Sequence, residues 1–201
     1  MKLFYAKGAC SLTVRIILNE LNTPFTDEAV DLRAKKTASG ANYWEINPKG
    51  SVPAIQLDNG QILTETQVIL QFLADNQPGT TLFAPVGAIK RYRIMEWLNF
   101  VSTELHKALG GLFNPNLTPE MKNNITIPLV NQRFKLLNQH LQHQTFLMGD
   151  QFTLPDAYLY LVMRWANYFQ LDLTAYPNLL AYIERVSQRE SVQKALKQEG
   201  F

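Results

Sequence analysis

Hydrophobic and polar positions in the first third of the chain switch between the period of strands and the period of helices. Residues 2–5 are typical of a short strand, and residues 25–30 of a second one. Between them, apolar residues recur at helical spacing: Leu12, Ile16, Ile17 and Leu21. Residues 32–40 are polar and predict a loop. This order of strand, helix and strand predicts a small α/β unit.

A hairpin and a helix follow that unit. Residues 51–57 and 61–63 predict strands joined through Asn59 and Gly60. Asn-Gly favours a type I′ turn, in which both central residues have positive φ. Thr64 followed by Gln67 predicts a capping box at the start of the next helix.

The rest of the chain has helical patterns only. Residues 78–86 predict a linker, because proline and glycine end the preceding helix. Two later stripes are apolar at helical spacing: Ile94, Leu98, Val101, Leu105 and Leu112, then Val130, Phe134, Leu137 and Leu141. Thr153 and Asp156 predict a second capping box, before a helix that is apolar on most sides. We therefore expect an α/β domain over 1–77 and an all-α domain over 87–201.

Composition and charge narrow the function classes. Nearly half of the 201 residues are hydrophobic and the net charge is +2, with basic residues scattered along the chain. Disorder and nucleic-acid binding are therefore not expected. No apolar run approaches the roughly 20 residues of a membrane helix, and no signal-peptide pattern is present. We expect a cytoplasmic protein without a membrane or nucleic-acid partner.

The single cysteine, Cys10, lies where the first strand turns into the first helix. Unpaired N–H groups and the helix dipole stabilise a negative charge at such a position, which predicts a lowered thiol pKa. The alternative is a small buried side chain without chemistry, which is common for a lone cysteine. With one cysteine there is no internal disulfide, and no ligand cluster predicts a metal.

Six short motifs in this order resemble the glutathione transferase family, and its bacterial beta class in particular. They are Gly8-Ala9-Cys10-Ser11, residues 47–54, residues 63–66, residues 96–100, residues 103–107 and residues 149–153. The resemblance covers essentially the whole chain. It implies a thioredoxin-like N-terminal domain, an all-α C-terminal domain, a homodimer and glutathione as co-substrate.

The resemblance also implies the position of the glutathione sulfur. It places Cys10 beside that sulfur, where the cysteine can form a mixed disulfide. Ser11 offers an alternative hydroxyl for the glutathione thiolate. In the family, Pro53 is cis, and the backbone of Val52 pairs with the cysteinyl segment as an added strand would. Sequence alone indicates only a strand edge at Pro53.

The ends of the tripeptide have candidate partners too. Glu65 is suited to bind an ammonium, and the helix start at Thr66 is suited to hold a carboxylate. Glutathione's γ-glutamyl end carries both groups, although helix capping alone would also explain these residues. Lys35 is the candidate for the glycyl carboxylate, with Lys36 as the alternative.

A polar row on the first long helix completes the predicted site. Asn99, Thr103 and His106 are spaced i, i+4 and i+7, a pattern that a solvent-facing side also gives. The resemblance directs this row toward glutathione, with His106 near the sulfur and Lys107 adding positive potential. It also implies that Asn99, Thr103 and Glu104 reach glutathione from the partner subunit.

Phe113 and Trp165 are candidates for a hydrophobic substrate pocket, with core packing as the alternative. The predicted function is conjugation of the glutathione thiolate to electrophilic, largely hydrophobic compounds, with peroxidase or thiol-disulfide exchange activity as possible additions. The alternatives are a ligand-binding or stress-regulatory protein on the same fold, or a specialised dehalogenase or isomerase.

Overall fold

The computed structural model describes residues 1–201, which form two compact units. The first unit comprises Met1–Thr80 and Arg189–Phe201, and the second comprises Thr81–Gln188. The first boundary falls within the segment expected as a linker. The C-terminal boundary of the second unit differs from the expected all-α domain over 87–201, because the last 13 residues of the chain, 189–201, pack with the N-terminal unit.

A five-stranded sheet forms the centre of the first unit, in the order β3-β2-β1-β4-β5. The strands are β1 (Lys2–Tyr5), β2 (Thr26–Asp31), β3 (Lys36–Thr37), β4 (Ala54–Gln56) and β5 (Ile62–Thr64). β1 and β2 are parallel, and the other pairs are antiparallel. The short β3 lies inside the segment that was expected to be a loop.

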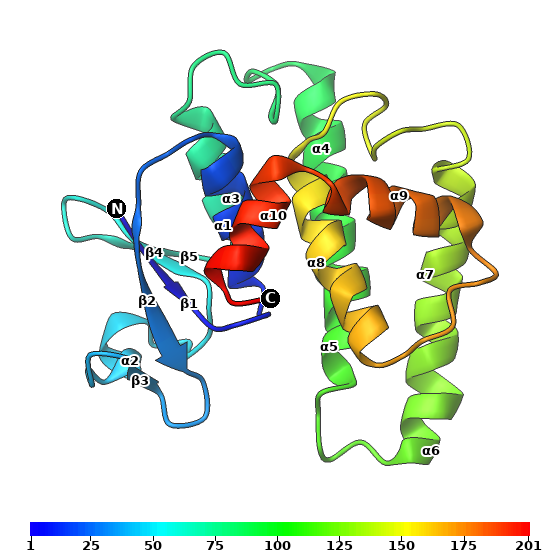
Figure 1. Ribbon diagram of the computed structural model, residues 1–201, viewed down its shortest axis with the longest axis horizontal. Coiled ribbons are helices and arrows are strands. Elements are labelled where there is room, and N and C mark those ends of the chain that lie inside the picture. The colour runs from blue at the N-terminus through cyan, green and yellow to red at the C-terminus, as the bar shows by residue number, and fades with distance from the viewer. The chain divides into compact units, whose positions relative to one another are not determined.

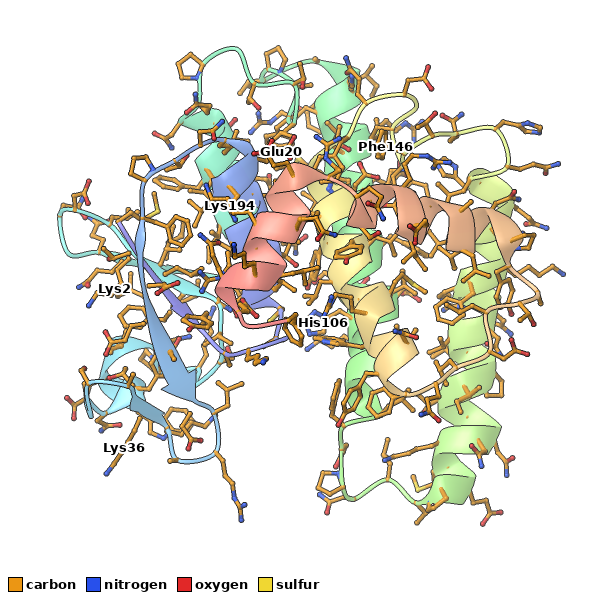
Figure 2. The ribbon with its side chains drawn as sticks, viewed as in Figure 1. Lys2, Glu20, Lys36, His106, Phe146 and Lys194 are labelled. Atoms are coloured by element: carbon orange, nitrogen blue, oxygen red, sulfur yellow. The ribbon has the colours of Figure 1, made fainter.

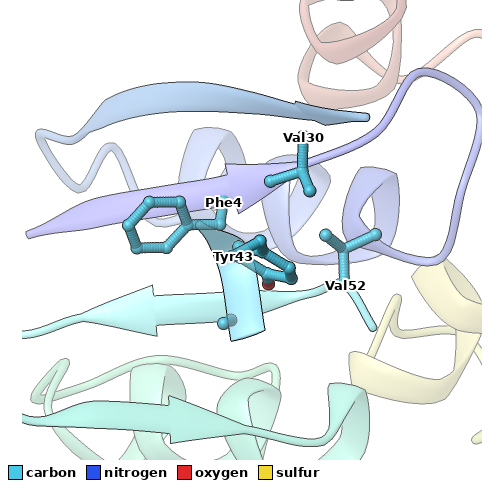
Figure 3. Close-up of a cluster of buried hydrophobic side chains, with 5 residues drawn as sticks. Phe4, Val30, Tyr43 and Val52 are labelled. Atoms are coloured by element: carbon cyan, nitrogen blue, oxygen red, sulfur yellow. The ribbon is translucent and has the colours of Figure 1, made fainter. Parts of the chain in front are cut away.

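Four helices accompany this sheet: α1 (Ser11–Glu20), α2 (Tyr43–Ile46), α3 (Thr66–Asp75) and α10 (Glu190–Gln198). α10 lies along α1, which explains why the end of the chain belongs to this unit (Figure 1). The sequence pattern did not predict the one-turn helix α2. Its Tyr43 is fully buried in an apolar cluster with Phe4, Val30 and Val52 (Figure 3).

The Asn-Gly turn differs from the predicted type I′ turn. Gly60 has a φ of 83°, whereas Asn59 has no positive φ. Gly60 N donates to the carbonyl of Leu57 at 2.9 Å, and Leu57 N donates to the carbonyl of Gln61 at 2.9 Å. This is a type I turn followed by a left-handed glycine, the usual form of the three-residue hairpin loop.

The predicted capping box at Thr64 and Gln67 is wrong. Thr64 is the last residue of β5, paired with Ala54, so the helix begins two residues later at Thr66. The residue before the helix is Glu65, with φ 71° and ψ 117°, and no side chain caps α3. A non-glycine residue with positive φ is uncommon, and such conformations cluster at functional sites.

The second unit contains helices only, as predicted. In chain order they are α4 (Ile89–Phe100), the π-helical η1 (Val101–His106), α5 (Lys107–Gly111), α6 (Pro119–Met121), the π-helical η2 (Lys122–Thr126), α7 (Ile127–His140), α8 (Leu154–Tyr168) and α9 (Pro177–Ser187). Every residue of the two predicted apolar stripes is buried. No helix in the chain is long and apolar enough to cross a membrane.

The predicted capping box of α8 is present and fully buried. Asp156 accepts hydrogen bonds from Thr153 N at 2.8 Å and Thr153 Oγ1 at 2.9 Å. Its other oxygen accepts from Leu147 N and the Tyr182 hydroxyl, each at 2.9 Å. Burial raises the pKa of Asp156 to about 6, against the opposing effect of these hydrogen bonds.

We expect Asp156→Asn to remove a pH-dependent part of the stability. In the native state Asp156 holds its proton up to about pH 6, whereas in the unfolded chain it loses it near pH 4. The free energy of unfolding of the native chain therefore falls, relative to the variant, by up to about 3 kcal/mol between pH 4 and 7. Urea unfolding of both proteins across this range measures the difference. A difference that is constant or rises with pH would contradict the assignment.

Candidate functional site

Cys10 occupies the N-cap position of α1, close to the place that the sequence predicted. Its side chain is partly buried, and Sγ donates a hydrogen bond to the carbonyl of Val52 at 2.8 Å. The Thr66 side chain also acts on the thiol through a hydrogen bond. The start of α1, the loop before Pro53 and the start of α3 therefore meet at this sulfur.

The predicted lowering of the Cys10 pKa is wrong. Burial raises the pKa of the thiol to about 11, and the negative charge of Glu65 raises it further. Hydrogen bonds from Thr66 and from the backbone at the helix start lower it, but by less than burial raises it. The helix N-terminus therefore acts as predicted, but the loss of hydration outweighs it. At neutral pH Cys10 is a thiol that donates a hydrogen bond.

The structure does not place the Ser11 hydroxyl where it would meet a ligand. Ser11 is fully buried, and its Oγ accepts from Ala6 N and donates to Ala6 O, both at 3.2 Å. The side chain therefore fixes the turn between β1 and α1. Ser11 is the first residue of α1 and is fully buried, whereas Cys10 before it is partly buried.

The peptide bond between Val52 and Pro53 is cis, as the resemblance implied. The carbonyl of Val52 accepts a hydrogen bond from the Cys10 thiol, while the N–H of Val52 has no acceptor within the chain. Tyr43 Oη and Asn47 Nδ2 both donate to the carbonyl of Ser51, at 2.9 and 2.7 Å, and fix this loop from behind. The loop thus presents a free backbone donor just before β4.

Glu65 and Thr66 differ in exposure. Thr66 is buried, whereas Glu65 is exposed and its carboxylate lies 2.6 Å from Lys49 Nζ. Lys49 Nζ also donates to Thr64 Oγ1 at 3.0 Å. Sequence reasoning missed Lys49, and only its place in the motif of residues 47–54 could have drawn attention to it. The Lys49 ammonium thus already pairs with the Glu65 carboxylate, which was predicted to bind the ammonium of the γ-glutamyl end of glutathione.

The structure distinguishes Lys35 from Lys36. Lys35 Nζ donates to the carbonyl of Gly50 at 2.6 Å and lies 5.2 Å from the centre of the Trp44 ring. Lys36 is exposed on β3 and extends outward from the unit (Figure 2). A Cβ at Gly50 would lie 2.5 Å from the Trp44 ring, so glycine is required there. Lys35 therefore faces the loop that precedes Val52, and Lys36 does not.

In the second unit the predicted polar row divides over two surfaces. Asn99, Thr103 and Glu104 line a groove of about 450 Å³ beside α7, where Glu104 pairs with Arg133 at 2.6 Å. His106 instead packs on α8. Thr103, Glu104 and His106 all lie in η1, and a π-helix turns less per residue than an α-helix, so Thr103 and His106 no longer share one face.

His106 belongs to an aromatic cluster of the second unit. Its Nδ1 lies 2.6 Å from the Tyr158 hydroxyl, and its ring meets Trp165 edge to face at 4.9 Å. Trp165 contacts Phe113 at 5.5 Å, and Phe113 is about half exposed. The two residues predicted for a hydrophobic pocket are therefore neighbours. Lys107 is exposed.

Comparison with known proteins identifies the chain. The family model "Glutathione S-transferase, N-terminal domain" matches residues 8–76, and "Glutathione S-transferase, C-terminal domain" matches residues 100–190. The chain belongs to the glutathione S-transferase family. The predicted family, fold class and enzyme class are confirmed.

Three relatives show how far this similarity extends. The glutathione S-transferase GstA of Escherichia coli O157:H7 is 43% identical over 201 residues, which cover 100% of both chains. A sphingomonad glutathione S-transferase solved with glutathione is 38% identical, with a TM-score of 0.95 and 100% of both chains covered. The bacterial beta-class enzyme of Sphingomonas chungbukensis has the same identity and TM-score and covers 100% of this chain and 99% of its own.

Proposed function

We propose that this glutathione transferase conjugates the glutathione thiolate to electrophilic, largely hydrophobic compounds. The observation that carries the proposal is the free N–H of Val52 beside the Cys10 thiol, on a loop that hydrogen bonds from Tyr43 and Asn47 hold in place. An extended peptide that carries a thiol can pair with this free backbone donor as an added strand would. The sphingomonad relative was solved with glutathione, which supports this ligand.

The tripeptide's charged ends fit the groups on either side of Val52. Glu65 would bind the γ-glutamyl ammonium, and the uncapped start of α3, at Thr66, would hold the carboxylate on the same carbon. Lys35 would meet the glycyl carboxylate at the other end. Thr66 is the first residue of α3, Glu65 directly precedes it, and Lys35 donates to the carbonyl of Gly50. All three residues belong to the first unit.

The chemistry that this site supports centres on the sulfur of glutathione. Cys10 retains its proton at neutral pH, so its S–H, which donates to the Val52 carbonyl in this structure, would turn to donate to the bound thiolate instead. That thiolate attacks an electrophilic carbon: the C–S bond forms, the bond to the leaving group breaks, and the leaving group departs with its electron pair. Thiol-disulfide exchange through Cys10 would be slow, because exchange requires its thiolate.

The second unit would supply the electrophile's surroundings. In this proposal His106 acts near the sulfur and Lys107 adds positive potential, while Phe113 and Trp165 line the pocket for the hydrophobic compound. The active form would be a homodimer in the cytoplasm, with Asn99, Thr103 and Glu104 directed to the glutathione of the partner subunit. The groove that these three residues share is the surface available for that contact.

Two measurements test the function. The purified protein is passed over immobilised glutathione, and the conjugation of a chlorodinitrobenzene-type electrophile is then followed with and without glutathione. Retention on the matrix and a thiol-dependent rate are expected. A protein that binds glutathione without a rate would be a binding protein on this fold, and one that does neither would end the proposal.

We expect Lys49→Ala to increase the affinity for glutathione. Lys49 must leave the Glu65 carboxylate before the γ-glutamyl ammonium can bind, and an exposed ion pair of this kind is worth up to about 1 kcal/mol. The dissociation constant should therefore fall up to about fivefold. Calorimetric titration measures it, with the exposed Lys36→Ala as the control. A weaker affinity in Lys49→Ala would show that Lys49 helps to bind the ligand.

A further inference from the structure

The last three residues of the chain contact the loop that leads to Cys10. The N–H of Gly8 donates to Glu199 Oε2 at 2.8 Å. Lys7 Nζ donates to the carbonyl of Gly200 at 2.7 Å. Both contacts join residues more than 190 positions apart in the sequence, and both lie within the first unit (Figure 1).

The terminal residue adds an aromatic contact to the same loop. The ammonium of Lys7 lies 4.7 Å from the centre of the Phe201 ring. A Cβ built on Gly8 would be 3.3 Å from the tip of that ring, so the ring rests directly on the backbone of Gly8. Gly8 has a φ of 70°, and the turn that it forms is followed two residues later by Cys10.

Glu199 connects this loop to the helix behind it. Its side chain is fully buried, and Oε1 accepts from Arg15 Nε at 3.2 Å while Oε2 accepts from Gly8. Arg15 is itself buried on α1. One carboxylate thus holds the chain two residues before Cys10 and five residues after it.

We propose that Glu199 and Phe201 are positioning residues for Cys10, because they fix the loop and the helix that place its sulfur against the carbonyl of Val52. Neither residue touches the ligand in this proposal. Their effect passes through the backbone of the Gly8 loop. The inference rests on the role of Cys10 in the proposed function, but it concerns the reactivity of the thiol, which is measurable without glutathione.

By holding the Gly8 loop in place, Glu199 and Phe201 would limit the access of water to the Cys10 thiol. The titratable groups that act on Cys10 are Glu65, at the start of α3, and Tyr43, on α2. Burial is the main cause of the raised pKa of Cys10. Releasing the Gly8 loop would admit water to the sulfur, lower the pKa toward its ordinary value and increase the thiolate fraction at neutral pH.

The experiment measures the alkylation rate of Cys10 by iodoacetamide between pH 6 and 11. Cys10 is the only cysteine, so every modified thiol is this one. The variants are Glu199→Gln and Phe201→Ala. The matched control is Gln198→Ala, which removes the hydrogen bond that Asn19 Nδ2, at the far end of α1, donates to Gln198 Oε1, and leaves the Gly8 loop intact.

At pH 8 we expect Glu199→Gln to react at least about tenfold faster than the native chain, and Phe201→Ala about threefold faster. The pH profiles of both variants should move to lower pH, while the profile of Gln198→Ala matches that of the native chain. If Glu199→Gln does not fold, as judged by circular dichroism, Phe201→Ala decides. Unchanged rates in the folded variants, or an equal acceleration in Gln198→Ala, would overturn the proposal.

Discussion

The alkylation rate of Cys10 in the native chain is expected to rise about a thousandfold between pH 7 and pH 10, without a plateau. Burial raises the pKa of the thiol to about 11, so each pH unit below that value reduces the thiolate fraction tenfold. At pH 7 the thiolate fraction is roughly 300-fold below that of free cysteine. The greater nucleophilicity of a more basic thiolate recovers only about a factor of 10.

Free cysteine, measured in the same buffers with iodoacetamide, provides the reference. Its rate should level off above about pH 9, because its thiol is then ionised. Cys10 should react roughly 30-fold more slowly than this reference at pH 7. A plateau for Cys10 below pH 9 would show that the helix N-terminus outweighs burial, as the sequence had suggested.

The second large effect is expected for Arg15→Ala. Arg15 is 1% exposed, pairs with Glu199 and Asp27, and lies 4.3 Å from the centre of the Tyr5 ring. Removing it leaves the buried carboxylate of Glu199 without its ion-pair partner, which costs about 3–5 kcal/mol. Urea unfolding should show a loss of this size, since the partly exposed Asp27 adds little.

The double variant Arg15→Met with Glu199→Gln serves as the comparison. Replacing both charges removes the uncompensated carboxylate, so much of the lost stability should return. A loss below about 1 kcal/mol in Arg15→Ala would show that water reaches Glu199. A double variant that is less stable than Arg15→Ala would show that the pair contributes net stability.

The sequence located Cys10 but could not determine its protonation. The strand-to-helix turn is a local feature, and the N-cap position follows from it. Burial depends on what tertiary folding packs around the sulfur, and its hydrogen-bond partners Val52 and Thr66 come from 42 and 56 positions away in the sequence. The local sequence pattern therefore indicates how the helix dipole lowers the pKa of Cys10, but it does not contain the larger, opposite effect of desolvation.

The Thr64 cap failed for a related reason. That prediction depended on the residue at which the helix begins, and element boundaries are the least reliable part of a prediction from pattern. Thr64 is the last paired residue of β5, and the helix begins at Thr66. The apolar stripes were insensitive to such shifts, because many residues define each of them.

The polar row at Asn99, Thr103 and His106 shows a third kind of limit. Its spacing was interpreted as one face of a regular α-helix, and the π-helical η1 breaks that regularity. Arg15 gave no signal at all, since its partner Glu199 lies 184 positions away. Contacts over such separations are fixed by topology, which the local pattern does not contain.

The return of residues 189–201 to the first unit has a consequence for synthesis on the ribosome. A unit made of the first 80 residues alone would be ready to fold early in translation, but this one lacks α10 until residues 190–198 have been made. At about 5–20 residues per second, the N-terminal segment waits roughly 6 to 25 seconds for its last helix. The second unit, which is continuous in sequence, is completed first. A premature stop near codon 189 would therefore spare the helical unit and damage the one that carries Cys10.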